Sequence, residues 1–187
     1  MPNIFKYFND IVSLTEKEIT EFKDILYPIE LTKGDKFLKY GQISKRIAFI
    51  EDGLLEMTFV EDNYENMLDF LFPNSFAVDY LSFLLDKPSN NIQITALENS
   101  KLMCFKKEDL ERLYDSNIKF QKIGRIIAER YYIAFVQRLR TNHLPPKERY
   151  ETLRKNFPEF IQQIPQYKIA SFLGVSAEWL SKLRAKK

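Results

Sequence analysis

The sequence predicts an α+β chain, with short antiparallel strands in its first part and helices in the remainder. Three features indicate this class. Turn-forming residues separate short β-prone runs from residue 29 to residue 106. A long helical pattern without proline follows over residues 120–140, and residues 166–185 predict two short helices joined at a glycine. About 45% of the chain is apolar, which is enough to build a core.

A helix is expected close to the N-terminus. Glu18 follows Thr15 at the spacing of a capping box, in which each side chain bonds the backbone N–H of the other residue. Apolar residues then recur at helical spacing as far as Leu26, and Pro28 ends the run.

The next stretch predicts seven short strands separated by turn formers. Asp52-Gly53, between two apolar runs, predicts a hairpin. Strands at this spacing indicate a compact antiparallel barrel or sandwich, interrupted by a short helix from Asp79 to Leu85. The expected strands are residues 29–32, 36–40, 46–51, 54–61, 66–72, 91–98 and 101–106.

Two helices are expected after the strands. Residues 107–110 open a short one, and Phe120 to Arg140 predict a helix of about 21 residues. The longer helix has two apolar stripes, so it needs cover on two sides. One stripe can pack on the barrel, and the other can meet either the same subunit or the same helix of a second copy. The first stripe is Phe120, Ile123, Ile127 and Ala134, and the second is Ile126, Ile133, Val136 and Leu139.

Asn142 to Pro146 form the clearest linker, because two consecutive prolines stop a helix. Short helices are expected beyond it at residues 147–156 and 158–163, and Pro165 marks a new start.

The segment from Gln166 to Ala185 meets the requirements of a helix-turn-helix, in which two helices cross steeply through a short turn. Ala170 is small where the helices touch, Gly174 suits a left-handed turn, and Ser176 can cap the second helix. Inward positions are occupied by Ile169, Leu173, Val175, Leu180 and Leu183. A helical hairpin that binds no DNA is the alternative interpretation of this pattern.

The outer side of the second helix is expected to enter the major groove of DNA. Glu178 can accept a hydrogen bond from a cytosine amino group, and Lys182 can donate to guanine. Ser181 and Arg184 are expected to reach phosphates. The predicted DNA-binding residues are Gln166, Tyr167, Ser176, Ala177, Glu178, Ser181, Lys182 and Arg184.

Charge is unevenly distributed along the chain. From Leu144 to the end, nine Lys and Arg stand against four Glu, a net charge of +5, so the first 143 residues contribute −3 to the total of +2. A basic end on an acidic body fits contact with a polyanion, and an ordinary solvated surface is the alternative.

Several classes of function are disfavoured. One cysteine, Cys104, and one histidine, His143, cannot build a zinc site or hold an iron–sulfur cluster, so no metal, no cofactor and no enzymatic activity are expected. No apolar stretch approaches the roughly 20 residues that a membrane span needs. The N-terminus lacks the pattern of a signal peptide. The chain is therefore expected to be cytoplasmic and to make no membrane contact.

The order of these parts resembles the cyclic-AMP receptor/fumarate–nitrate regulator (CRP/FNR) family of transcriptional regulators. The resemblance implies an N-terminal β-roll of the cupin-like jelly-roll type, a long dimerisation helix and a C-terminal helix-turn-helix, with boundaries at 1–106, 107–141 and 142–187. It also implies a homodimer that reads a pseudo-palindromic site in double-stranded DNA. The segments that carry it are residues 31–34, 47–53, 96–100 and 169–184.

Two departures from this family matter. Members that bind cyclic AMP have a Gly-Glu pair opening the short helix and an Arg-Ser/Thr-Ala run before the next strand. Here those stretches are residues 76–80 and 89–92, and no arginine lies between Arg46 and Arg112. A buried phosphate without a cation is costly, so an effector other than cyclic AMP, or none, is expected. The candidate pocket residues are Asp79, Tyr80, Asn90 and Asn91.

The second departure is the ending, which lacks the terminal β-hairpin wing of the family. Fewer phosphate contacts, and DNA binding that depends more on dimerisation and low salt, are expected from this. A second function stays open at this point: a β-barrel sensor or binding module that acts through protein contacts, with weak or no DNA binding.

Overall fold

The computed structural model describes residues 2–61, 64–89, 91–158 and 161–185. The chain divides into two compact units, residues 1–128 and 129–187. The division falls within helix α5 (Ile118–Asn142), inside the segment that the sequence predicts to connect the domains.

The first unit begins with helices α1 (Asn3–Asn9) and α2 (Glu16–Ile25). The capping box predicted for α2 is confirmed: the Glu18 N–H donates to Thr15 Oγ1 at 3.3 Å, and the Thr15 N–H donates to Glu18 Oε2 at 2.7 Å. At α1, the cap comes from far along the chain. The Glu51 carboxylate accepts hydrogen bonds from the free amides of Asn3 and Ile4.

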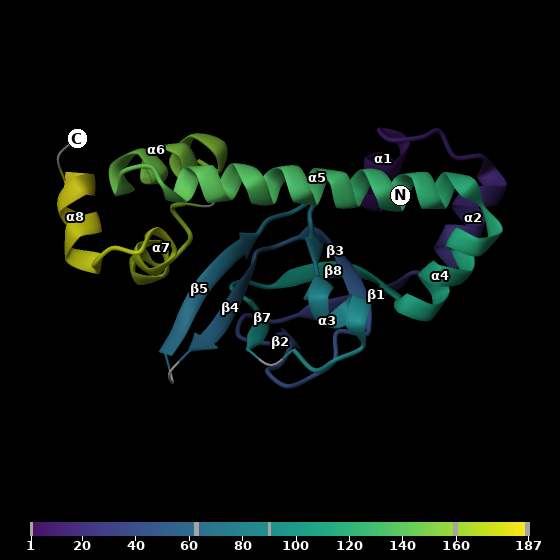
Figure 1. The fold of residues 1–187 in the computed structure, drawn as a ribbon, viewed down its shortest axis with the longest axis horizontal. Helices are drawn as coiled ribbons and strands as arrows, with labels where there is room; N and C mark the ends of the chain where they lie inside the picture. Colours follow the sequence, from purple (N-terminus) through teal and green to yellow (C-terminus); the bar gives the residue numbers. More distant parts are fainter. Residues whose placement is uncertain (1, 62–63, 90, 159–160, 186–187) are drawn as a thin grey trace. The chain divides into compact units, whose positions relative to one another are not determined.

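In the part of the chain that the structure describes, eight strands form two four-stranded antiparallel sheets, in the orders β1-β8-β3-β6 and β2-β7-β4-β5 (Figure 1). All seven predicted strands are present, and the two-residue strand β6 is additional. Helix α3 (Tyr80–Leu85) lies between β6 and β7, as predicted. The strands are β1 (Tyr27–Leu31), β2 (Lys36–Leu38), β3 (Arg46–Asp52), β4 (Leu55–Glu61), β5 (Tyr64–Leu71), β6 (Phe76–Ala77), β7 (Ile92–Ala96) and β8 (Ser100–Lys106).

The hairpin predicted at Asp52-Gly53 is wrong. Strand β3 pairs with β6 and β8, whereas β4 pairs with β5 and β7, so this turn carries the chain from one sheet to the other. Gly53 has φ +97°, and a Cβ placed on it would lie 2.3 Å from Ser100 Oγ. The glycine therefore permits a tight corner against β8. The hairpin is formed instead by β4 and β5, which pair from Leu55↔Leu71 to Glu61↔Tyr64.

Successive residues of β3 divide between two apolar clusters. Ile47 and Phe49 face the helices, while Ala48 and Ile50 face the other sheet. The cluster under the helices contains eight of the sixteen phenylalanines: Phe5, Phe8, Phe22, Phe49, Phe76, Phe83, Phe105 and Phe120. The cluster between the sheets is Phe37, Leu38, Ala48, Ile50, Leu55, Leu71, Ala77, Ile94, Leu102 and Cys104. Burial raises the pKa of the Cys104 thiol to about 12, so it stays protonated at neutral pH.

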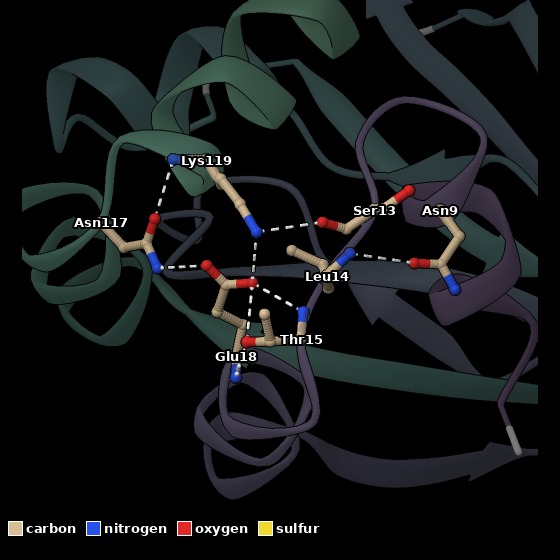
Figure 2. A network of polar contacts seen from close by, with 7 residues as sticks. All are labelled: Asn9, Ser13, Leu14, Thr15, Glu18, Asn117 and Lys119. Carbon is tan, nitrogen blue, oxygen red and sulfur yellow. Dashed lines mark hydrogen bonds and ion pairs between the residues drawn. The ribbon is translucent and has the colours of Figure 1, made fainter.

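Helix α4 (Lys107–Ser116) follows β8 directly, and a polar network joins its end and the start of α5 to α2 (Figure 2). The Glu18 carboxylate accepts from Lys119 Nζ at 2.8 Å and from Asn117 Nδ2 at 3.0 Å. Its side chain is only 11% exposed. The Lys119 ammonium, with the Thr15 amide and Asn117, lowers the pKa of Glu18 to about 2. The network fixes the N-terminal end of α5 on the first unit.

In the second unit, the helices that follow α5 are α6 (Pro146–Asn156), α7 (Gln166–Leu173) and α8 (Ala177–Ala185). The predicted linker is shorter than expected, because Pro146 is the first residue of α6, a position that suits proline. The helix predicted at 158–163 is wrong for the described part of that segment, where residues 161–163 form turns. Pro165 disfavours a helical backbone at Ile164, and the segment before it is too short to be stable as a helix.

Candidate nucleic-acid interface

The turn between α7 and α8 depends on Gly174. Its backbone is left-handed, with φ +62° and ψ +37°. The amides that leave α7 are satisfied there: the Gly174 N–H donates to the Ser171 carbonyl at 3.0 Å, and the Val175 N–H donates to the Ala170 carbonyl at 2.9 Å. The corner is therefore a closed helix end, and in Figure 1 the two helices leave it in clearly different directions.

Helix α8 starts at a serine cap. The Trp179 N–H donates to Ser176 Oγ at 3.1 Å, and the Leu180 N–H donates to the Ser176 carbonyl at 3.1 Å. The Ser176 side chain thus satisfies one of the amides that a helix leaves free at its N-terminus, as its position in the sequence predicts.

The inner faces of the two helices hold them together. Ile169, Ala170 and Leu173 of α7 and Leu180 of α8 are buried, each at most 2% exposed. Val175 and Leu183, also predicted to point inward, are half-buried. The small side chain of Ala170 lies in this buried set, as expected where two helices approach closely.

The outer face of α8 is open. Ala177, Glu178, Ser181, Lys182 and Ala185 are all exposed. They follow the spacing i, i+1, i+4, i+5 and i+8 and so share one side of the helix. Arg184 is half-buried and lies beside this face. Glu178 and Lys182 place a hydrogen-bond acceptor and a hydrogen-bond donor one helical turn apart, and base edges are contacted through such groups.

The start of α7 offers a second polar surface. Pro165 precedes the helix and no side chain caps it, and Gln166 and Tyr167 in its first turn are exposed. The Lys168 ammonium lies over the Tyr167 ring, 5.4 Å from its centroid. Lys168 was not among the predicted DNA-binding residues. It directly follows Gln166 and Tyr167 in the sequence.

Charge and anchoring support an interface of this kind. Residues 129–187 contain twelve Lys and Arg and five Glu, a net charge of +7. Within this unit, the Arg138 guanidinium of α5 lies 4.9 Å from the centroid of the Phe172 ring of α7. This contact ties the helix-turn-helix to the end of α5, a link that no local sequence pattern predicts.

The later part of α5 exposes large apolar side chains. Phe120 and Ile123 of the first predicted stripe are buried in the first unit. Of the second predicted stripe, Ile133 and Leu139 are exposed. The exposed residues Tyr131, Tyr132, Phe135 and Leu139 recur at spacings of one, three and four residues and share one side of the helix. Large exposed apolar side chains grouped on one helix face are typical of an interaction surface.

The predicted effector residues are separately engaged. Asp79 is buried and accepts the N-cap hydrogen bond of α3 from the Ser82 N–H at 3.2 Å. Tyr80 is 49% exposed and stacks on the Phe83 ring. Asn91 is exposed, and Asn90 lies outside the described residues. Their assignment to a ligand pocket stays a prediction.

Among the described residues, no group of three or more His, Cys, Asp or Glu comes together as a metal site. Across the described helices, none is both long enough and apolar enough to cross a membrane.

The described elements follow one another as a jelly roll, a long helix and a helix-turn-helix. Residues 28–117 match the family model of the cyclic nucleotide-binding domain. Among solved structures, a transcriptional regulator of the CRP/FNR family from Eubacterium rectale has a TM-score of 0.70 at 16% identity, with 98% of this chain and 87% of that chain covered.

FixK2 from Bradyrhizobium japonicum has a TM-score of 0.68 at 14% identity, with 87% of this chain and 84% of that chain covered. A cyclic nucleotide-binding domain containing protein from Listeria monocytogenes has a TM-score of 0.67 at 15% identity, with 98% and 88% covered. No curated protein shows significant sequence similarity to the chain. The chain therefore has the fold of the CRP/FNR family of transcriptional regulators, with residues 28–117 as its cyclic nucleotide-binding-type domain.

Proposed function

We propose that this protein is a homodimeric transcriptional regulator that reads a pseudo-palindromic DNA site with α8. The observation that supports this proposal most directly is the outer face of α8. Glu178, Ser181 and Lys182 are exposed on that face, while Leu180, on the other side of the helix, is buried. In DNA-binding helix-turn-helix proteins this face lies in the major groove.

The roles of the individual residues follow from their chemistry. Glu178 accepts from a cytosine amino group and Lys182 donates to guanine O6 or N7. Ala177 offers only a methyl group and suits the methyl of thymine. Gln166, Tyr167, Ser176, Ser181 and Arg184 position the unit on the phosphate backbone, supported by the net charge of +7 on residues 129–187.

A dimer follows from the exposed stripe of α5. Tyr131, Tyr132, Phe135 and Leu139 present apolar surface that the same stripe of a second copy covers by two-fold symmetry. Two recognition helices then meet half-sites about 34 Å apart, one turn of the duplex. Because the cyclic-AMP signature is absent, any effector is a molecule other than cyclic AMP.

The DNA test uses selection from a random duplex library, followed by fluorescence anisotropy on the selected site and on an unrelated duplex. Lys182→Ala and Glu178→Ala should each relax preference at one base pair by about 5- to 100-fold, as expected for loss of one base contact. Lys155→Ala removes the same charge as Lys182→Ala from α6, and it should weaken both duplexes equally. Unchanged sequence preference in the double variant refutes base reading by α8.

The dimer test is sedimentation of the full chain at micromolar concentration. Phe135→Glu should shift the chain from dimer to monomer. Gln137→Glu adds the same charge on the opposite side of α5, at an exposed position, and should leave the dimer intact. A monomeric parent chain that selects no DNA sequence would favour a sensor module acting through protein contacts.

A further inference from the structure

An open hollow of about 620 Å³ lies at one end of the β-roll, within the first unit. It is bounded by the start of β1, by β2, by the segment before β3 and by the junction of β8 with α4. This volume is in the range of small-molecule sites. Of the residues predicted for an effector pocket, the described ones, Asp79, Tyr80 and Asn91, do not line it. The lining residues that matter here are Tyr27, Phe37, Lys45, Arg46, Lys106 and Glu108.

The charges around this hollow are out of balance. Arg46 and Lys106 are direct partners across β3 and β8, and like charges at such positions repel. Lys45 adds a third cation; among the described lining residues Glu108 is the one acid, and Asp109 acts on Tyr27 from nearby. Among the described interactions, neither Lys45 nor Lys106 makes an ion pair. An anion between the cations would relieve the repulsion.

The hollow also has an aromatic wall. The Arg46 guanidinium lies over the Phe37 ring, 4.9 Å from its centroid, so the cation is held in place. Tyr27 stands beside it, and burial raises the pKa of the Tyr27 phenol, which keeps it a neutral donor. The half-buried Tyr27 ring therefore suits a flat apolar group, while the cationic rim, formed by Lys45, Arg46 and Lys106, suits an oxyanion.

We propose that this hollow binds a small aromatic oxyanion, with its charged group between Arg46 and Lys106 and its ring against Tyr27. Such a molecule would bridge the roll and the first residues of α4, the helix that leads into α5. The site supplies the proposed regulator with an effector position, and to that extent it rests on the proposed function.

Calorimetric titration of the full chain with phenyl phosphate tests the site, with inorganic phosphate and phenol as separate probes. One saturable site is expected, with phosphate at least tenfold weaker and phenol without measurable binding. Lys106→Gln should weaken phenyl phosphate binding by about tenfold or more, the effect of losing one charge-assisted contact. Lys101→Gln removes an exposed charge from the other end of β8 and should leave binding unchanged.

Three outcomes overturn the proposal. The first is that phenyl phosphate shows no saturable binding, the second is that inorganic phosphate binds as tightly as phenyl phosphate, and the third is that Lys106→Gln and Lys101→Gln lose equal affinity for phenyl phosphate. Lys106 is exposed, so its variant should fold, and an unchanged melting temperature verifies this. Arg46→Lys provides a second test, since it keeps the charge but loses the planar stacking group. The titration contains no DNA. If phenyl phosphate does not bind but the chain still selects a DNA sequence, only this site is refuted. If phenyl phosphate binds but no DNA sequence is selected, only the proposed function is refuted.

Discussion

Replacing Gly174 by alanine tests whether the corner between α7 and α8 holds the candidate interface together. The residue is left-handed, with φ +62° and ψ +37°. An added Cβ would meet no atom within 4 Å, so the whole cost comes from the backbone conformation and none from a clash. That cost is about 1–2 kcal/mol for a residue with a Cβ, or roughly 5- to 30-fold in the unfolding equilibrium.

Urea unfolding, monitored by tryptophan fluorescence, measures this cost in the helix-turn-helix itself. Trp179 is the single tryptophan of the chain and lies in α8. The midpoint should fall by roughly 0.5–1 M urea with an unchanged slope. Gly174→Asn is the matched variant. Asparagine tolerates a left-handed backbone, so this variant should lose less stability than Gly174→Ala. Equal losses in both variants, or no loss with alanine, would refute the backbone argument.

Three further substitutions test other parts of the structure. Gly53→Ala should destabilise the first unit more than the corner variant destabilises the second, since its Cβ would lie 2.3 Å from Ser100 Oγ; far-UV circular dichroism during urea unfolding measures this. Glu18→Gln keeps the capping-box geometry but loses the charge opposite Lys119. A carboxylate whose pKa falls from 4.5 to about 2 on folding stabilises the protein above pH 4.5 and loses this effect between pH 4.5 and 2. The free energies of unfolding of parent and variant should therefore become equal as the pH is lowered through this range. Ser176→Ala should cost about 1 kcal/mol in the same fluorescence assay, and Ser176→Asp, which keeps a cap, should not.

Features set by neighbouring residues were predictable from the sequence. The capping box at Thr15 and Glu18 needs only four residues, and both of its hydrogen bonds are present. The corner glycine and the serine cap of α8 are equally local, and both lie where the pattern places them. Their geometry depends on one turn of backbone, so long-range packing had little opportunity to override it.

Features that depend on distant partners were not predictable. Asp52-Gly53 has the composition of a hairpin, yet β3 and β4 belong to different sheets, because strand partners are chosen by burial of whole faces. The carboxylate that caps α1 belongs to Glu51 on β3, and nothing near α1 indicates it. The two-residue strand β6 is too short to show a period of its own.

The same contrast between local and long-range features applies to the candidate sites. The exposed face of α8 follows from helical periodicity, so the sequence places Glu178 and Lys182 on it correctly. A sensing site follows from the space between elements, which no period encodes. Between the sheets, Ala48, Ala77 and Ile94 are fully buried, and a ligand entering there must displace packed side chains, at a cost that grows with each one moved. The hollow beside Arg46 is open already. A ligand that acts on this β-roll therefore meets less resistance at the cationic rim than between the sheets, and the search for an effector should begin there.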